Sequence, residues 1–353
     1  MPILRNTGFS AELNYLLFLL WKNKGGSSVE KKLDRLIRDY QKNVHEALVL
    51  MHRSGIHMPA SRAAWIKSNI PHAGLLDGGV PYFKHGAGCA VHMPNGKVDF
   101  DFGVGGEIDE FDAWRLFKFA KENLSEYGFD NKNDLEVCFE EAVSEGFLVR
   151  SAYCLFYLRG RARVLAVDID SRLLGDKLPP RNMDDVLVLN NDYFEVADLM
   201  LLNYNNLRRK WERDGRLSND KSIDMRIYLR SWLGFLAVTC EGFETIGMRR
   251  LLREDRPVAF VGLTPRSDAV GSLIKKNRDP LRELRNKTFH LRKDAGAIRT
   301  FFAPDANRIS WARELHKALK EFFTKYRLEC ELHYVLNGRR GEVCLKRPPP
   351  KKW

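Results

Sequence analysis

The spacing of apolar residues changes along this 353-residue chain, and that change limits the folds open to it. Between residues 29 and 51 the apolar positions recur every three or four residues, which predicts an amphipathic helix. Residues 88–102 instead form two runs around Asn95-Gly96, a dipeptide typical of tight hairpin turns. Beyond residue 191 the spacing is helical. We therefore predict an α+β amino-terminal domain, with helices and a β-hairpin, followed by an all-α helical bundle.

The same patterns place the other elements and the domain boundaries. Further helices are expected at 10–22, 63–66, 109–124 and 133–145, with a final strand pair at 147–158 and 162–170 and mostly loop at 55–80. Residues 171–191 are rich in Gly, Pro and Asn, which predicts a linker between a domain at 1–170 and a helical bundle at 192–330. Helices of the bundle are expected at 192–212, 223–252, 279–293 and 305–328. Residues 337–353 are expected to form a basic, proline-rich tail.

The net positive charge of the chain comes from its second part. Residues 1–150 carry 18 Lys and Arg against 20 Asp and Glu, whereas the remainder carries 40 against 26. The whole excess of +12 therefore comes from the part expected to be helical. A basic domain indicates a polyanionic partner, of which nucleic acid is the first candidate, although a generally basic surface also serves solubility.

Several classes of protein are disfavoured by composition. No apolar run reaches the roughly 18–20 residues that a membrane span needs, so no membrane partner is expected. The segment from Leu13 to Trp21 lacks the flanking features of a signal peptide, which makes the cytoplasm the default location. The six cysteines form no C-x-x-C pair, and we interpret them as reduced, mostly buried thiols.

Residues 281–294 hold the side chains that metal-independent RNA cleavage requires. In that reaction the ribose 2′-hydroxyl attacks the adjacent phosphate, so a base, an acid and a fixed cation are needed. Histidine suits proton transfer near neutral pH, and the arginine fork suits a phosphate. The segment has five basic residues against two acidic ones and includes Arg285, Asn286 and His290. On a helix Asn286 and His290 share one face, and Arg285 reaches toward the site from the side.

This Arg-Asn-x-x-x-His pattern resembles the R-x(4–6)-H motif of the HEPN superfamily. The resemblance implies a bundle of four or five helices that dimerises, with the motifs of two copies lining a shared cleft. Many members are metal-independent endoribonucleases of toxin–antitoxin, abortive-infection and other antiviral systems. By position, Arg285 would bind the phosphate, His290 would be the catalytic histidine, and Asn286 would match the polar residue that often follows the arginine.

The surrounding residues extend the predicted site. The apolar stretch 232–244 ends in carboxylates, and the resemblance implies that Glu241, or else Glu244, orients the arginine or histidine of the motif. The expected substrate-binding residues are Arg282, Lys287, Arg292 and Lys293. No metal and no cofactor is expected. A purely structural interpretation stays open, in which Arg285 forms a salt link with Glu241 or Glu283 and His290 is an ordinary helix residue.

The amino-terminal half carries a second group of chemically versatile residues. It resembles a small bacterial domain family of unknown function with an H-G-x-G-C, D-x-D-F-G and F-D-x-W-R-L layout, here running from His85 to Leu116. His85, Asp99, Asp101, Asp109 and Asp112 could gather around a metal or act as acid and base. The alternative is that Asp99 and Asp101 form a solvated strand face and that Asp109 caps a helix. A sensing or regulatory role is expected for this domain.

The sequence thus predicts a metal-independent endoribonuclease of a toxin or antiphage-defence type, acting on RNA as a homodimer, with an antitoxin or a trigger protein as a further expected partner. The alternative is a non-catalytic HEPN-like module that binds RNA or protein, or only dimerises, next to a regulatory amino-terminal domain. A third interpretation makes the amino-terminal residues the enzyme.

Overall fold

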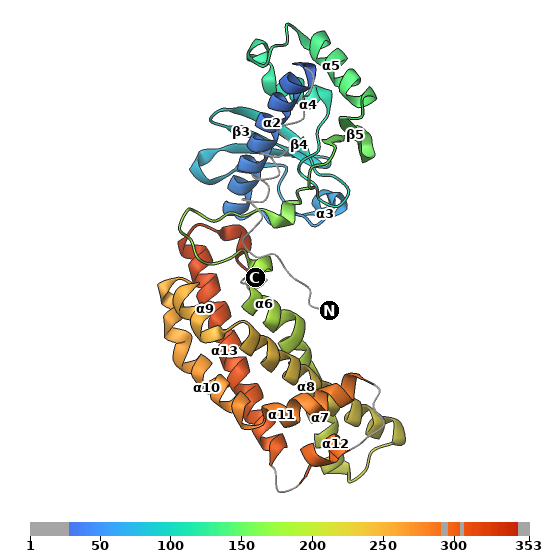
Figure 1. The fold of residues 1–353 in the computed structure, drawn as a ribbon, viewed down its shortest axis with the longest axis vertical. Coiled ribbons are helices and arrows are strands. Elements are labelled where there is room, and N and C mark those ends of the chain that lie inside the picture. The colour runs from blue at the N-terminus through green and yellow to red at the C-terminus, as the bar shows by residue number, and fades with distance from the viewer. Residues whose placement is uncertain (1–27, 291–295, 304–306, 345–353) are drawn as a thin grey trace, which may run out of the picture. The chain divides into compact units, whose positions relative to one another are not determined.

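The computed structural model describes residues 28–290, 296–303 and 307–344 (Figure 1). The chain divides between Ile169 and Asp170 into two compact units, which we call the amino-terminal and the carboxyl-terminal unit. Each unit has its own apolar core. Within the described ranges, every helix is too short or too polar to cross a membrane. The helix expected at 10–22 lies outside the described residues.

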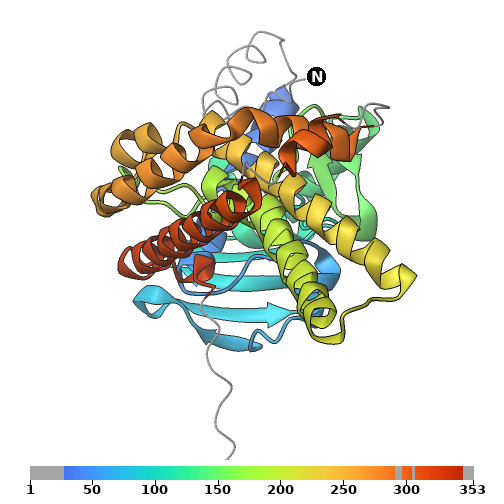
Figure 2. The ribbon, with the colours of Figure 1, turned by 90° about the horizontal axis from the view of Figure 1, so that it is seen from below.

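The amino-terminal unit packs one long helix against a small antiparallel sheet. The helix is α2 (Ser28–Arg53), and its apolar stripe, including Leu33, Leu36 and Val44, is fully buried. The four strands are β1 (Ala73–Leu75), β2 (Pro81–His85), β3 (Gly88–Met93) and β4 (Gly96–Asp101), hydrogen-bonded in that order and seen as light-blue arrows in Figure 2. The β3–β4 hairpin confirms the hairpin predicted from the sequence, but its two turn residues are Pro94 and Asn95, because Gly96 already belongs to β4 and pairs with Met93.

Other parts of this unit differ from the sequence-based expectation. Strands β1 and β2 lie in and just beyond the segment expected to be loop. Asp112, and not Asp109, is the N-cap of α4 (Ala113–Ala120), because its carboxylate accepts from the Arg115 backbone N–H at 2.7 Å. The strands β5 (Leu148–Arg150) and β6 (Phe156–Leu158) both fall within 147–158, and 162–170 contains no strand. The chain reverses early because Tyr153 and Cys154 adopt positive φ angles. The remaining helices of the unit are α3 (Arg62–Lys67) and α5 (Lys132–Ser144).

The described residues of the carboxyl-terminal unit contain helices and no strand, as the helical spacing predicted. The helices are α6 (Asp185–Leu189), α7 (Glu195–Asp214), α8 (Asn219–Thr245), α9 (Met248–Glu254), α10 (Thr264–Lys276), α11 (Arg278–Phe289), α12 (Gly296–Phe301) and α13 (Arg308–Leu336). A π-helical turn at Asn190–Phe194 joins α6 to α7. Figures 1 and 2 show α7 and α8 side by side, and α11 also packs on α8.

Two predicted helices have different limits in the structure. The helix expected at 223–252 is two helices, because Gly247 takes a left-handed conformation, with φ 65°, between α8 and α9. The helix expected at 279–293 leaves helical geometry after Phe289. Helices α10 and α12 were not expected from the spacing.

The core of the carboxyl-terminal unit includes a histidine whose proton can be placed. The indole N–H of Trp232 donates to Nδ1 of His316 at 3.2 Å, and an indole nitrogen can only donate. The imidazole proton therefore lies on Nε2, which is 2.9 Å from Asp198 Oδ1. Burial lowers the pKa of His316, and the nearby Asp198 only partly offsets this. The ring is accordingly a neutral bridge between α8, α13 and α7.

Residues 171–191, expected to be a linker, pack inside this unit. Asp184 is fully buried and caps α6, accepting from the backbone N–H groups of Val186 and Leu187 at 2.9 and 3.0 Å. Its other oxygen accepts from Arg256 at 3.1 Å and from the Tyr326 hydroxyl at 2.8 Å. The two prolines and the glycine of this segment lie in its irregular part, before α6 begins at Asp185.

The described part of the expected tail is also folded. Arg339 is fully buried and donates to Asp176 at 2.9 Å and to Glu342 at 2.6 Å. Glu342 in turn accepts from the Ser171 hydroxyl at 3.1 Å and from the Arg181 backbone N–H at 2.8 Å. Residues near the start of the carboxyl-terminal unit are therefore bonded to a residue near the end of its described part. Residues 345–353 of the expected tail lie outside the described residues.

Candidate functional site

The predicted motif lies on α11, which packs closely against α8. Gly234 of α8 permits the approach, because a Cβ at that position would lie 2.7 Å from the Phe289 ring. The Phe289 ring also meets Phe235 edge-on at a centroid distance of 5.4 Å. On the inner side of α11, Leu281 and Leu284 are buried in the core of the unit. The apolar spacing of the motif helix thus fixes which of its side chains face α8.

Arg285 is held by Glu241, the carboxylate that the sequence singled out first. Arg285 Nη2 donates to Glu241 Oε1 at 2.7 Å, and the Arg285 side chain is only 21% exposed. Its Nε atom is buried without a hydrogen bond among the described atoms. A charge-assisted contact of this kind fixes the direction of the guanidinium while leaving donors unused. The arrangement is that of an arginine held in place between two helices by a carboxylate.

Two further arginines of the same segment reach the carboxylates of α8. Arg282 Nε lies 3.8 Å from Glu241 Oε1, and Arg278 Nε lies 3.5 Å from Glu244 Oε2. The sequence reasoning included Arg282 but missed Arg278. The signal was present, because positions 278, 282 and 285 are four and three residues apart and share one helical face.

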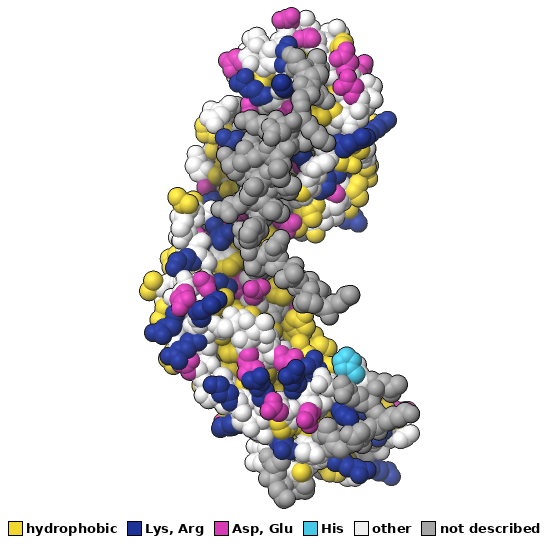
Figure 3. Space-filling view, in the orientation of Figure 1, with side chains coloured by type: hydrophobic (Ala, Val, Ile, Leu, Met, Phe, Trp, Pro, Cys, Tyr) yellow, Lys and Arg dark blue, Asp and Glu magenta, His cyan; other side chains and the backbone are white. Residues whose placement is uncertain are grey.

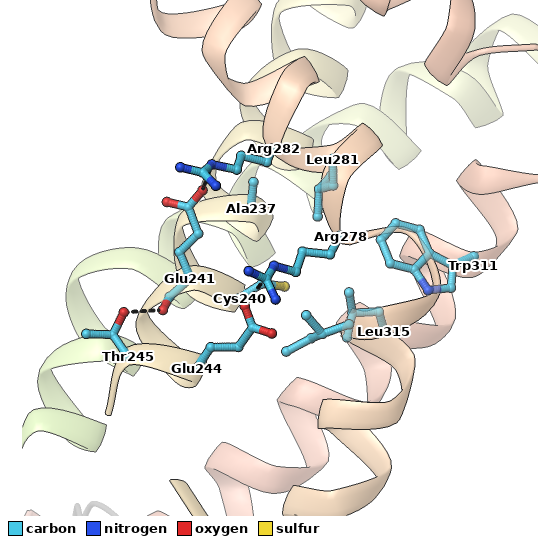
Figure 4. A pocket seen from close by; sticks show the side chains of 11 residues that line it. Ala237, Cys240, Glu241, Glu244, Thr245, Arg278, Leu281, Arg282, Trp311 and Leu315 are labelled. Atoms are coloured by element: carbon cyan, nitrogen blue, oxygen red, sulfur yellow. Dashed lines mark hydrogen bonds and ion pairs between the residues drawn. The ribbon is translucent and has the colours of Figure 1, made fainter. Parts of the chain in front are cut away.

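These charged side chains surround a pocket of about 390 Å³ between α8, α11 and α13 (Figure 4). Its apolar lining comes from Ala237, Leu281, Ile274, Trp311 and Leu315, together with Cys240, whose thiol pKa is raised by burial. Figure 4 shows Arg278 and Arg282 pointing toward Glu244 and Glu241 across the opening. The site therefore combines an apolar floor with a rim of paired charges.

His290 is not on the helical face that the sequence predicted. The helix ends at Phe289, and His290 follows in an extended conformation with φ −125° and ψ 138°. Its backbone N–H still donates to the Asn286 carbonyl at 3.1 Å, but its side chain is exposed. The reason is local, since Thr288, Phe289 and His290 are successive residues of low helix propensity. His290 therefore projects from the end of the motif helix and does not stack above Asn286.

The remaining predicted residues are placed only in part. Asn286 and Lys287 are half-buried on α11, and Arg282 is exposed. Arg292 and Lys293 lie outside the described residues. Figure 3 shows dark-blue basic and magenta acidic side chains next to one another on the carboxyl-terminal unit, so the described basic residues on this face are largely interspersed with acidic ones.

A second cluster forms on one face of the amino-terminal sheet. His85, Gly88 and Asp101 are direct neighbours across β2, β3 and β4. Gly88 is required there, because a Cβ would lie 2.3 Å from Asp101 Oδ1 and 1.9 Å from the Phe100 carbonyl oxygen. His85 Nε2 lies 3.2 Å from Asp99 Oδ1, although at an angle that is poor for a hydrogen bond. The glycine of the H-G-x-G-C motif thus lets the histidine approach the two aspartates.

Arginines from outside the sheet complete this cluster. Arg115 of α4 lies 3.0 Å from Asp101 Oδ1 and 3.5 Å from Asp99 Oδ1, and it also pairs with Asp112. Arg62 lies 3.3 Å from Asp101 Oδ2. Burial acts to raise the pKa of Asp99, but His85 and Arg115 outweigh it and leave that pKa lowered. The expectation of a solvated acidic face is therefore wrong, because α4 covers these carboxylates with a cation.

Asp109 does not join this cluster. It accepts from Arg163 Nε at 2.8 Å, and the neighbouring Glu110 pairs with the same guanidinium at 2.6 Å. In the part of the chain that the structure describes, no group of three or more His, Cys, Asp or Glu side chains is arranged to hold a metal ion. The metal interpretation of the amino-terminal residues is thus without support there, and what remains is a mixed cluster of histidine, aspartates and arginines.

Comparison with known families identifies part of the amino-terminal unit. Residues 33–158 match the family described as Domain of unknown function (DUF6896). This range contains every residue of the His85–Asp99–Asp101–Arg115 cluster. The match stops short of the carboxyl-terminal unit, so the resemblance of that unit to HEPN domains rests on the motif and its setting alone. No curated protein and no solved structure is significantly similar to the chain.

Proposed function

We propose that the carboxyl-terminal unit cleaves RNA without a metal, using Arg285 and His290 in a site that a second copy of the chain completes. The observation that carries the proposal is the 2.7 Å contact between Arg285 and Glu241 at the edge of an arginine-lined pocket. It fixes a guanidinium on α11, and the exposed His290 follows directly after the last residue of the same helix. These are the two groups that the HEPN-like motif would require.

The chemistry needs one proton acceptor and one proton donor. His290 would take the proton of the ribose 2′-hydroxyl as its oxygen forms a bond to phosphorus, and the bond from phosphorus to the 5′-oxygen would break. A protonated histidine from the second copy would give its proton to that leaving oxygen. Arg285 would stabilise the charge that develops on the phosphate oxygens. The products are a 2′,3′-cyclic phosphate and a 5′-hydroxyl.

A purely structural role accounts for Arg285 but not for His290. The salt link with Glu241 does serve the packing of α8 on α11. His290, however, is exposed and lies beyond the helix, so the core does not need its imidazole. Among the described residues of the carboxyl-terminal unit His290 is also the one exposed histidine, which is the reason for proposing a dimer.

The test is cleavage of a labelled RNA by the full-length protein in the presence of a chelator. We expect His290→Ala and Arg285→Ala each to lower the rate by at least ~100-fold, since one such donor contributes about 10²–10³ in comparable sites. His57→Ala is the matched control, because His57 is an exposed histidine of the amino-terminal unit. The same two variants are expected to relieve growth arrest on expression, as a toxin or defence role would require.

Three outcomes would contradict the proposal. Saturable, salt-sensitive RNA binding without a product bearing a 2′,3′-cyclic end would indicate a non-catalytic binding module. Full activity in both variants would refute the assigned roles outright. Analytical ultracentrifugation of the active protein tests the dimer, and a strictly monomeric active species would contradict it.

A second candidate function is acid–base chemistry in the amino-terminal unit. It is favoured by the convergence of His85, Asp99, Asp101 and Arg115 on one sheet face. Loss of activity in Asp101→Ala, with His290→Ala unaffected, would favour this candidate over RNA cleavage by the carboxyl-terminal unit.

A further inference from the structure

The pocket beside Arg285 has a lining that suits a flat, partly apolar ring. Ala237, Leu281 and Leu315 contribute aliphatic surface. The indole N–H of Trp311 is already donated to the Leu273 carbonyl at 2.9 Å, so this ring offers the pocket carbon surface and no unsatisfied donor. Apolar pockets with a few convergent polar groups are the usual form of small-ligand sites. A nucleobase has this character, because its faces are apolar and its edges carry the hydrogen-bonding groups.

The polar groups at the opening come in complementary pairs. Glu244 faces Arg278 at 3.5 Å, and about half of the Arg278 side chain is exposed. This separation is too long for a strong hydrogen bond, and an exposed ion pair of this kind contributes little to stability. A ligand that offers donors to the carboxylate and acceptors to the guanidinium can therefore replace the contact at small cost. Glu241 is less available, because it holds Arg285 at 2.7 Å.

Among the four RNA bases, guanine fits this pair of groups. Its N1–H and N2–H₂ donors lie next to one another and match the two oxygens of a carboxylate. Its O6 and N7 are adjacent acceptors that match an arginine fork. Adenine and cytosine would each turn a ring-nitrogen acceptor toward the carboxylate. Uracil would offer a single N3–H donor between two carbonyl oxygens, one of which would face the second carboxylate oxygen. Carboxylate and guanidinium together thus discriminate for guanine and against the other three.

We propose that this pocket binds a guanine base, with Glu244 accepting from its N1–H and N2–H₂ and Arg278 donating to O6 and N7. The inference rests on the proposed function, since it assigns the base to the RNA that Arg285 and His290 cleave. Glu241 lies between the pocket and Arg285, so a base bound in the pocket brings its own backbone toward the arginine. Cleavage is accordingly directed to phosphates next to guanosine.

Binding of nucleoside monophosphates to the full-length protein tests the pocket directly. We expect 3′-GMP to bind at least about tenfold more tightly than 3′-AMP, 3′-CMP or 3′-UMP, because one bidentate contact to a base provides discrimination of this size. Glu244→Gln turns an amide donor toward the guanine donors and is expected to remove the preference. Glu212→Gln is the matched control, because Glu212 forms an exposed pair with Arg208 away from the pocket and its loss should leave the preference intact. Equal affinity for the four nucleotides, or an unchanged preference in Glu244→Gln, would overturn the proposal.

Experiments with RNA show whether the bound guanine belongs to RNA or to a free nucleotide. They also test the guanine site separately from the ribonuclease proposal. Mapped cleavage ends should lie next to guanosine in the wild type and lose that bias in Glu244→Gln. His290→Ala should keep the 3′-GMP preference while losing cleavage. If 3′-GMP binds selectively but no variant or wild type cleaves RNA, the guanine site stands and the ribonuclease proposal fails. If RNA containing guanosine binds no better than RNA lacking it while 3′-GMP is preferred, a free guanine nucleotide is the ligand and the assignment to RNA is overturned.

Discussion

Replacing Asp184 by Asn tests whether the carboxyl-terminal unit depends on one buried carboxylate. All four of its hydrogen bonds are accepted: two from the α6 backbone on one oxygen, and two from Arg256 and Tyr326 on the other. An asparagine has the same shape but only one accepting atom. Whichever way the asparagine amide is turned, its NH₂ group faces either the α6 backbone N–H groups or the donors of Arg256 and Tyr326. The substitution therefore breaks the network without leaving a cavity.

The expected loss follows from the burial of Arg256. This side chain is 5% exposed, and an arginine stays charged when its partner is removed. Breaking one side of a buried ion pair costs about 3–5 kcal/mol, a large share of the roughly 5–15 kcal/mol by which a domain is stable. At about 2–4 °C per kcal/mol for a domain of this size, the melting temperature of the carboxyl-terminal unit should fall by roughly 6–20 °C.

Calorimetry combined with amide hydrogen exchange gives the readout for this variant. Exchange should accelerate in α6, α9 and α13, while peptides of the amino-terminal unit serve as an internal reference. Asp185→Asn is the matched control, because Asp185 is the next residue and is exposed. A double variant, Asp184→Asn with Arg256→Met, should recover part of the loss by removing the unpaired charge. A loss below about 1 kcal/mol in Asp184→Asn, or no recovery in the double variant, would refute the reasoning.

Three further expectations follow from the same structure. Because burial lowers the pKa of His316 in the folded protein, the unfolded chain binds the proton first as the pH falls below about 6.5. The free energy of unfolding should therefore decrease with falling pH, by no more than ~1.4 kcal/mol per pH unit. A denaturant titration of His316→Gln at several pH values should lack this dependence. Gly88→Ala should destabilise the amino-terminal unit by about 1–3 kcal/mol and accelerate exchange in β3 and β4, whereas Gly271→Ala, whose added Cβ meets no atom within 4 Å, should not destabilise the chain. In the native protein a thiol reagent should modify only the exposed Cys154 and Cys344, and the four buried cysteines should react only after denaturation.

Local patterns in the sequence predicted the features that depend on neighbours along the chain. The β3–β4 hairpin, the long amphipathic α2 and the helical character of the carboxyl-terminal unit all follow from patterns over a few residues. The contact between Arg285 and Glu241 was implied by the resemblance to the HEPN motif and also by the purely structural interpretation, since both paired this arginine with Glu241. The end of α11 was not, since the decision between helix and extended chain at His290 involves small differences in propensity.

Contacts between distant segments account for most of the rest. Asp99 and Asp101 alternate along a strand in the way that a solvated face does, and only the arrival of Arg115 from α4 makes them a partly buried cluster. Residues 171–191 have the composition of a linker, yet Asp184 finds its partners about 70 and 140 residues further on. Neither pairing leaves a periodic signal, because each is fixed by the packing of whole elements.

The contacts around Glu342 also have a mechanical meaning. Ser171 and Arg181, near the point where the chain enters the carboxyl-terminal unit, are bonded to a residue just before the point where the described chain leaves it. A force applied to both ends of the unit would load these bonds first, and the α8–α11 pair that carries the motif would be strained only after they open. For the same reason the unit is suited to transplantation, since a segment whose ends already touch can be inserted into a surface loop of another protein without being stretched. Such a graft must run from Asp170 to Cys344, because one that ended with α13 at Leu336 would leave out Arg339 and Glu342.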